Sequence, residues 1–238
     1  AKAVELVFFR GRDAATGQRI GPDTGKVEDF ATWERFREAF EIQLRALLDH
    51  VLDISDEADR IRAEFEPTPY LSALVGGCAE KGRDITQGGA RHNYITVEGV
   101  AFATAADSLT AVRKLVFEDG RVSMGELAQA LRDNFEGHEP LRRTLLNKAP
   151  KYGNDDDYAD EMARWLSRTW TEMVFKRTSP ATGRRYRGGY LSWNYWVSFA
   201  PSTAATPDGR KRGTYLSNAI GPVDGADRNG PTAVTLSV

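Results

Sequence analysis

The 238-residue sequence predicts an α/β chain that is rich in helix, with a few strands near its C-terminal end. Up to about Phe175, apolar residues recur every three or four positions, which is the period of an amphipathic helix. Beyond Arg177 that period is lost, and glycine, proline, serine and aromatic residues become frequent, as in strands and loops. We therefore expect a mainly helical region over residues 1–178 and a region of strands and loops over 179–238.

Composition narrows the class of protein. An apolar share of 41% supports a globular core, and a net charge of −2 does not indicate binding to nucleic acid or to an anionic membrane. A single cysteine excludes an internal disulfide and fits a reducing compartment. No apolar run approaches the roughly 20 residues that span a bilayer, and no signal peptide opens the chain. Three scattered histidines and one cysteine argue against a zinc site.

Most of the expected elements are helices. Pro67 and Pro69 end the longest one, whose pattern is compatible with a break near residues 53–56. Ser123 and Glu126 have the three-residue spacing of a capping box. The helices are expected over residues 1–9, 30–65, 70–80, 104–117, 123–135, 140–148 and 157–175.

Two stretches near the C-terminus are predicted to be strands. Tyr190–Phe199, with the sequence YLSWNYWVSF, is the better candidate, and Thr232–Val238 is the second. In a strand, Trp193, Tyr195 and Phe199 would share one face. That face could border a pocket, although packing in a core is the default role of such residues. Residues 88–94 are expected to form a loop that leads into a further short extended segment.

The segment Leu146–Asp160, LNKAPKYGNDDDYAD, combines a helix stop, a glycine turn and several carboxylates. Pro150 cannot continue the preceding helix, and Gly153 supplies a left-handed turn. Three consecutive aspartates could bind a hard cation, but adjacent helical residues point about 100° apart and cannot converge on one ion. We therefore expect Asp155–Asp157 to accept bonds from backbone N–H groups at the start of the next helix, without a metal.

Six stretches in order resemble the glycyl radical enzymes, the family of pyruvate formate-lyase and its dehydratase, decarboxylase and lyase relatives. None of the stretches is distinctive alone, but their order and spacing are similar to those of the family, and the upstream IGPDTG of residues 20–25 also fits. One stretch has histidine where the family usually has the tyrosine of GGARYN. The stretches are 88–93 (GGARHN), 106–112 (ADSLTAV), 114–117 (KLVF), 150–157 (PKYGNDDD), 206–210 (TPDGR) and 230–233 (GPTA).

The resemblance implies a fold and a function. The chain would form part of the family's α/β barrel, namely strands of its second half with the surrounding helices. The parent enzyme would catalyse radical elimination (dehydration or C–X lysis) or decarboxylation of a small polar substrate, anaerobically in the cytoplasm. An activating enzyme that uses S-adenosylmethionine and an iron–sulfur cluster would install the parent's glycyl radical. The parent would be a homodimer that binds neither nucleic acid nor membrane.

The resemblance also implies that the radical carriers lie outside this sequence. In the family, a glycine in an RVxGY-like segment stores the radical, and a cysteine on a loop inside the barrel receives it. The chain begins within an expected helix and ends within an expected strand, so we expect a piece of a larger protein that supplies barrel wall and packing and binds no cofactor itself. The alternative is a non-catalytic truncated or split homologue that acts as a structural or interaction subunit.

Pocket candidates follow from the resemblance, because the 190–199 segment is close to a barrel strand that borders the substrate cavity. Trp193, Tyr195 and Phe199 are therefore candidates, together with His92 and Asn93 of the GGARHN stretch. A histidine can exchange protons near neutral pH, but a lone one is more often a hydrogen-bonded loop residue.

A reactive pair of Cys78 and Glu80 is a further hypothesis, less favoured than a packing role for the cysteine. Their sequence, GCAE, looks like the family's catalytic G-C-V-E, in which a thiyl cysteine is followed by a general base. Cys78, however, precedes Gly88 by ten residues, where the family carries a second, non-catalytic cysteine. A small buried hydrophobe is the commoner role for a free cysteine.

The basic run over residues 208–212, DGRKR, could contact phosphate. It follows a proline and carries only three positive charges. Pro207, Asp208 and Gly209 are favourable turn residues in their own right. We therefore expect a surface turn at this position.

Overall fold

A computed structural model describes all 238 residues and divides them into two compact units. Unit 1 comprises Ala1–Leu47, Gly99–Arg168 and Tyr190–Val238, and unit 2 comprises Leu48–Glu98 and Thr169–Gly189. The units are therefore interleaved along the chain, and neither is one continuous segment. None of the helices combines the length and the apolar character that crossing a membrane requires.

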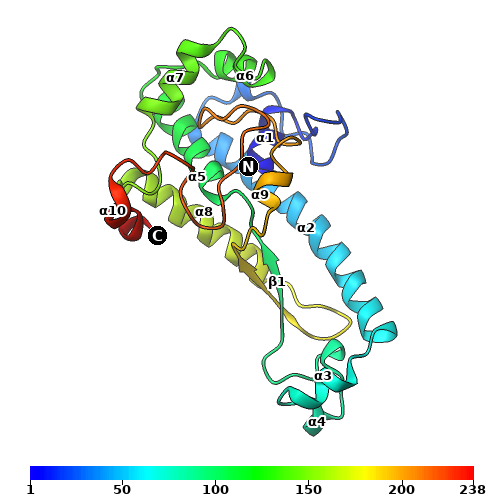
Figure 1. The fold of residues 1–238 in the computed structure, drawn as a ribbon. Helices are drawn as coiled ribbons and strands as arrows, with labels where there is room; N and C mark the ends of the chain where they lie inside the picture. The colour runs from blue at the N-terminus through cyan, green and yellow to red at the C-terminus, as the bar shows by residue number, and fades with distance from the viewer. The chain divides into compact units, whose positions relative to one another are not determined.

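The long helices confirm the periodic pattern of the sequence (Figure 1). Helix α2 (Trp33–Phe65) is continuous through residues 53–56, where the sequence allowed a break. Helix α5 (Phe102–Ala111) continues into a π-helical stretch over Val112–Glu118. Ser123 Oγ accepts the Glu126 N–H at 3.2 Å, so the predicted N-cap is present. The helices are α1 (Lys2–Phe8), α2 (Trp33–Phe65), α5 (Phe102–Ala111), α6 (Met124–Arg132), α7 (Glu139–Lys148) and α8 (Asp157–Phe175).

The helix expected over residues 70–80 is divided into α3 (Pro69–Leu74) and α4 (Cys78–Lys81). Gly77 has a φ of 103°, in the left-handed region that interrupts a right-handed helix. The backbone N–H of Arg91 donates to the Gly76 carbonyl oxygen at 2.8 Å, so the break is held by a distant segment. The prediction of a single helix was wrong because it used only the local period.

Both strands predicted near the C-terminus are wrong. Residues 232–237 belong to helix α10 (Gly230–Ser237), in which Pro231 occupies a first-turn position that suits its fixed φ. In the 190–199 segment, Trp193 has a φ of +47°, and the short helix α9 (Tyr195–Ser198) follows. An extended segment needs a partner strand for its backbone groups, and this segment turns before it can pair.

The strands that do form are β1 (Tyr94–Glu98) and β2 (Arg185–Gly189), which pair in parallel in unit 2 (Figure 1). The extended segment after the GGARHN loop is thus confirmed as β1, whereas β2 was not predicted. Gly188 lies so close to Trp170 that an added Cβ would be 3.0 Å from its indole nitrogen, so a larger residue there would require the indole to shift. The α/β composition is confirmed, with a sheet of two strands.

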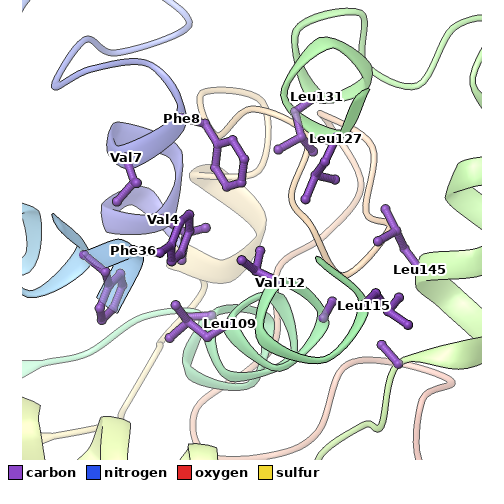
Figure 2. Packing of buried hydrophobic residues seen from close by; sticks show 14 of the residues in the cluster. Val4, Val7, Phe8, Phe36, Leu109, Val112, Leu115, Leu127, Leu131 and Leu145 are labelled. Atoms are coloured by element: carbon purple, nitrogen blue, oxygen red, sulfur yellow. The ribbon is translucent and has the colours of Figure 1, made fainter. Parts of the chain in front are cut away.

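Unit 1 has a continuous apolar core (Figure 2). Leu109, Val112 and Leu115 are fully buried at its centre, on α5 and the π-helical stretch. Side chains from α1, α2, α6 and α7 converge on them, as Figure 2 shows for Phe8 and Leu145 among others. This core joins segments of unit 1 that are far apart in sequence, including the helices next to the PKYGNDDD and TPDGR stretches.

Unit 2 contains a network of charged and hydroxyl groups. Asp56 on α2 accepts bonds from Arg177 Nη2 at 2.6 Å and from the Tyr186 hydroxyl at 2.6 Å. Asp59, one turn further along α2, forms an ion pair with Arg184 and accepts the Ser179 hydroxyl at 2.6 Å. Asp59 is nearly inaccessible to solvent, so its charge depends on these partners.

Candidate functional site

Three of the sequence motifs meet in unit 1. The Tyr152 N–H of PKYGNDDD donates to Asp107 Oδ1 of ADSLTAV at 2.9 Å. Lys151 Nζ donates to the Asp208 carbonyl oxygen of TPDGR, also at 2.9 Å. Arg142 on α7 donates from Nε to the Gly209 carbonyl oxygen at 2.9 Å. Segments separated by up to about a hundred residues are therefore joined at one place.

The TPDGR turn is buried, so the expectation of a surface turn was wrong. Arg210 is only 5% exposed, and its guanidinium donates to the carbonyl oxygens of Thr203, Ala204, Lys211 and Thr214. Four carbonyl acceptors satisfy the donors of a buried guanidinium, which explains why a basic residue tolerates this position. The local turn chemistry was read correctly, but burial depends on contacts from elsewhere in the chain.

Gly209 is required by the same packing. Its φ is +98°, a conformation that residues with a Cβ rarely adopt. A Cβ there would also lie 2.8 Å from Leu146 Cγ. The turn can therefore lie against α7 only with glycine at this position.

Asp107 is the most unusual polar residue of this region. It is 1% exposed, and its Oδ1 accepts the Tyr152 N–H, whereas its Oδ2 has no hydrogen-bond partner. Burial raises the pKa of Asp107 to about 7, although the charge of Lys151 and the bond from Tyr152 both act to lower it. The carboxyl group is therefore able to exchange a proton near neutral pH.

These residues surround a pocket of about 270 Å³ in unit 1, which we call the motif pocket. Five cationic side chains and three carboxylates line it, so the lining has an excess of positive charge. The charged lining residues are Asp107, Arg142, Lys151, Asp208, Arg210, Lys211, Asp224 and Arg228.

The remainder of the PKYGNDDD stretch organises the C-terminal part of unit 1. Asn154 Oδ1 accepts the N–H groups of Arg228 and Asn229 at 2.8 and 3.1 Å. Asp156 accepts the N–H groups of Tyr158 and Ala159 at 3.0 and 3.3 Å, and therefore caps α8. The predicted aspartate cap is confirmed for this one residue.

Asp155 has a different role from Asp156. Its φ is +55°, and its own N–H donates to Ser237 Oγ at 2.9 Å, so Asp155 belongs to the turn. The backbone N–H groups at the start of α8 bond to Asp156 alone among the three carboxylates. In the chain as a whole, no three histidine, cysteine, aspartate or glutamate side chains are placed to hold a metal ion.

The GGARHN stretch lies in unit 2. Asp84, four residues before the stretch, accepts several hydrogen bonds that order the segment leading into it. Asp84 accepts the Thr68 N–H, the Ser72 hydroxyl and the Thr86 N–H at 2.8–3.0 Å. Desolvation opposes its ionisation, but these bonds lower the pKa of Asp84 to about 2. A Cβ at Gly89 would clash with the Arg83 carbonyl oxygen, so the motif glycine permits a close backbone approach.

His92 and Asn93 follow that tight turn in unit 2. His92 is exposed, and Asn93 is partly buried. Asn93 Nδ2 donates to the Ile85 carbonyl oxygen at 3.3 Å, and its Oδ1 accepts from Arg184 Nη1 at 3.5 Å. The amide thus links the loop to the segment before β2.

Cys78 and Glu80 both lie on α4. Cys78 is 2% exposed, whereas the Glu80 carboxylate is at the surface, 3.6 Å from Arg91. Glu80 Oε2 accepts the Gly77 N–H at 2.8 Å, so the carboxylate caps its own short helix. Bonds from backbone N–H groups, with the charge of Arg91, lower the pKa of Glu80.

The aromatic candidates Trp193, Tyr195 and Phe199 belong to unit 1, whereas His92 and Asn93 belong to unit 2. Trp193 is 72% exposed, and Tyr195 and Phe199 are each almost half exposed. The Tyr195 and Phe199 rings stack with centroids 5.1 Å apart and an interplanar angle of 15°, as residues four positions apart in a helical turn can. Sequence reasoning did not select Asp107, Arg142 or Lys151, although membership of the motifs was a signal for two of them.

The comparison with known proteins identifies the class. The family model for pyruvate formate lyase-like proteins matches residues 1–200. The isethionate sulfite-lyase of Nitratidesulfovibrio vulgaris is 36% identical over 246 residues, which cover all of this chain and 29% of that protein.

Solved structures share the fold. Hydroxyproline dehydratase from Clostridioides difficile, with trans-4-hydroxy-L-proline bound, has 38% sequence identity and a TM-score of 0.96 over 99% of this chain and 30% of that one. A glycyl radical enzyme from Archaeoglobus fulgidus has 35% identity and a TM-score of 0.91 over the same shares. The chain belongs to the pyruvate formate lyase-like family of glycyl radical enzymes, and spans about 30% of the length of the relatives it matches.

Proposed function

We propose that this chain is part of a glycyl radical enzyme that catalyses elimination from a small polar substrate, by dehydration or by lysis of a C–X bond. The observation that supports this most is the match, over the whole chain, to a dehydratase and to a sulfite-lyase. Both of these relatives have names that describe an elimination from a small polar molecule. Decarboxylation, which the family also performs, is the less favoured reaction.

Within the parent enzyme, the role of this chain would be to supply part of the barrel wall and its packing. The apolar core of unit 1 and the buried TPDGR turn support such a scaffold role. We propose that the exposed aromatic rings of Trp193, Tyr195 and Phe199 border the substrate cavity. His92 and Asn93 are pocket candidates on a separate ground, namely their place in the GGARHN stretch that resembles the family. Large exposed aromatic groups are costly in water unless a ligand or another segment covers them.

The parent would carry its radical on a glycine, and a partner enzyme would install it using S-adenosylmethionine and an iron–sulfur cluster. Such a radical is destroyed by oxygen and by stray hydrogen donors, so the site must exclude solvent and the enzyme must work anaerobically. We propose a homodimer in the cytoplasm. In this arrangement Cys78, which is buried at the start of α4, is a packing residue.

The test uses the protein at its natural length, incubated without oxygen with a radical-activating enzyme. We expect an electron paramagnetic resonance signal of a carbon-centred radical, and product from a hydroxylated substrate only when that signal is present. Trans-4-hydroxy-L-proline, isethionate and glycerol form the first substrate panel, and hydroxyproline dehydratase activated in parallel is the positive control.

Two results would overturn the proposal. One is a missing radical signal while the control enzyme is activated, which would favour the structural or interaction subunit. The other is full turnover by protein that carries no radical.

A further inference from the structure

We infer that an exposed apolar side of α2 in unit 2 is the surface through which two copies of this chain pair, as a parallel two-stranded coiled coil. The inference rests on the homodimer of the proposed function and names its contact surface. This surface, which we call the α2 seam, consists of Val51, Ile54, Ala58, Ile61 and Phe65.

The α2 seam has the spacing of a coiled coil. Its members are separated by three, four, three and four positions, which is the alternation of the a and d positions of a heptad repeat. Because α2 is continuous here, this spacing brings them to one side of the helix over about 21 Å. The four larger side chains are between 40% and 68% exposed, and Ala58 is partly buried. A contiguous apolar stripe of this kind marks a surface that a partner covers.

The fold of unit 2 uses the opposite side of the same helix. Leu52, Asp56 and Asp59 are buried there, roughly 150° around the helix axis from the α2 seam at 100° per residue. Asp56 accepts the Tyr186 hydroxyl and Asp59 accepts the Ser179 hydroxyl, so the rest of unit 2 packs on that side. A partner can therefore cover the α2 seam without any rearrangement of these contacts.

The charges beside the α2 seam indicate a second copy of the chain in parallel orientation. Glu57 and Glu64 occupy g positions on one flank, and Arg62 occupies an e position on the other. In a parallel pair in register, a g residue faces the e residue five positions later on the other helix, so Glu57 would meet Arg62 of the partner subunit. Two-fold symmetry repeats this contact. In an antiparallel pair the two acidic flanks would meet and repel each other.

Glu57 can make this contact although it is already paired on its own helix. It forms an ion pair with Arg60 at 2.8 Å, but both side chains are more than half exposed, so the pair contributes little to stability. A carboxylate also has room to accept further bonds. Arg62 is exposed as well. Since α2 is helical before association, pairing does not have to order its backbone, which lowers the cost of binding.

The first test measures the dissociation constant of the dimer by analytical ultracentrifugation of the natural-length protein, without radical activation. Ile61→Glu places a charge in the α2 seam and is expected to raise this constant by about tenfold or more. Ile42→Glu is the matched control, because Ile42 is an equally exposed isoleucine of α2 outside the seam, and it is expected to leave the constant unchanged. Circular dichroism checks that both variants fold.

The second test exchanges the charges. Glu57→Arg and Arg62→Glu are each expected to raise the dissociation constant by about tenfold, because like charges then face each other in both symmetric contacts. The protein that carries both substitutions has opposite charges in both contacts again, and its dissociation constant is expected to return to within about twofold of the wild-type value. Such a rescue requires that the surface contacted is a second copy of the same surface.

Three results would overturn the inference. One is a natural-length protein that stays monomeric at every concentration. Another is a dimer that Ile61→Glu leaves intact, which would place the contact elsewhere. The third is a failure of the double charge exchange to restore pairing, as expected if another segment of the natural-length chain covers the α2 seam. None of these results bears on the radical reaction, and a missing radical signal with normal dimerisation would overturn the proposed reaction alone.

Discussion

The interior of unit 1 and the interior of unit 2 are stabilised by different kinds of interaction. The buried cluster of unit 1 is made almost entirely of alanine, leucine, valine and phenylalanine side chains around α5. In unit 2, carboxylates on α2 bind the arginine, serine, threonine and tyrosine residues that flank and form β2. Burial of apolar area is non-directional and scales with the area removed from water, whereas a charged network depends on every partner being present.

This difference teaches where each unit is vulnerable. A truncated apolar side chain leaves a cavity whose cost is limited by relaxation of its neighbours. Removal of one partner from a buried ion pair leaves an uncompensated charge. We therefore expect the largest single-residue effects in unit 2, even though unit 1 has the larger apolar core.

The largest effect is expected for Asp59→Ala. The substitution removes the carboxylate that pairs with the Arg184 guanidinium and accepts the Ser179 and Thr182 hydroxyls, so Arg184 loses its charged partner. We expect a loss of about 4 kcal/mol in the free energy of local unfolding of unit 2. Hydrogen exchange of the β2 amides measures it. Glu57→Ala, which breaks an exposed pair with Arg60 on the same helix, is the control, and an equal effect of both would refute the network.

The next effect is expected for Leu109→Ala in unit 1. Leu109 is fully buried at the centre of the apolar cluster, so truncation removes contacts and leaves a cavity. We expect unit 1 to lose about 3 kcal/mol in free energy of unfolding, measured by urea titration. Leu71→Ala removes a half-exposed leucine of α3 and should change stability much less. A smaller loss for Leu109→Ala than for Leu71→Ala would contradict the core assignment.

The sequence predicted the long helices well, because their period and their stops are local properties. Ser123 illustrates this, since its cap could be read from two residues three positions apart. The strands could not be read in the same way. β2, RYRGG, has no alternation of apolar and polar residues, and it exists because β1, some ninety residues earlier, pairs with it.

The residues of the candidate site were even harder to predict from the sequence than the strands. The motifs pointed to PKYGNDDD and TPDGR, but an aspartate in the middle of α5 has the appearance of a solvent-facing residue. Asp107 is buried because the whole of α5 is packed inside unit 1, and its partner is the backbone N–H of Tyr152, 45 positions later. The aromatic run at Tyr190–Phe199 failed for a related reason, since alternation of large residues also fits a turn followed by a short helix.

The third effect concerns pH and unit 1. The pKa of Asp107 is raised from 3.8 to about 7 in the folded chain, so folding favours the protonated acid. The contribution of Asp107 to stability is therefore complete below about pH 4 and is lost as the pH rises through about 7. We expect a decrease of about 2 kcal/mol, because relaxation and water penetration reduce the full value of such a shift.

Urea midpoints of the wild type and of Asp107→Asn between pH 4 and 8 measure that decrease. The amide of this variant cannot titrate, so the difference between the two proteins isolates Asp107 from other carboxyls, such as Asp160, whose pKa is also raised by burial. Parallel pH profiles for the two proteins would show that the buried carboxyl does not titrate in this range.

The smallest effects come from a matched pair of tyrosines. The Tyr186 hydroxyl in unit 2 donates to Asp56 at 2.6 Å, and the Tyr190 hydroxyl in unit 1 donates to Ser167 Oγ at 2.9 Å. A hydrogen bond to a charged acceptor is stronger than one to a neutral acceptor, so Tyr186→Phe should cost about 2 kcal/mol and Tyr190→Phe about 1 kcal/mol. Urea titration with hydrogen exchange separates the two units. If Tyr190→Phe proved the more costly, the contrast between a charged unit 2 and an apolar unit 1 would fail, because the charged acceptor would then add nothing to the bond.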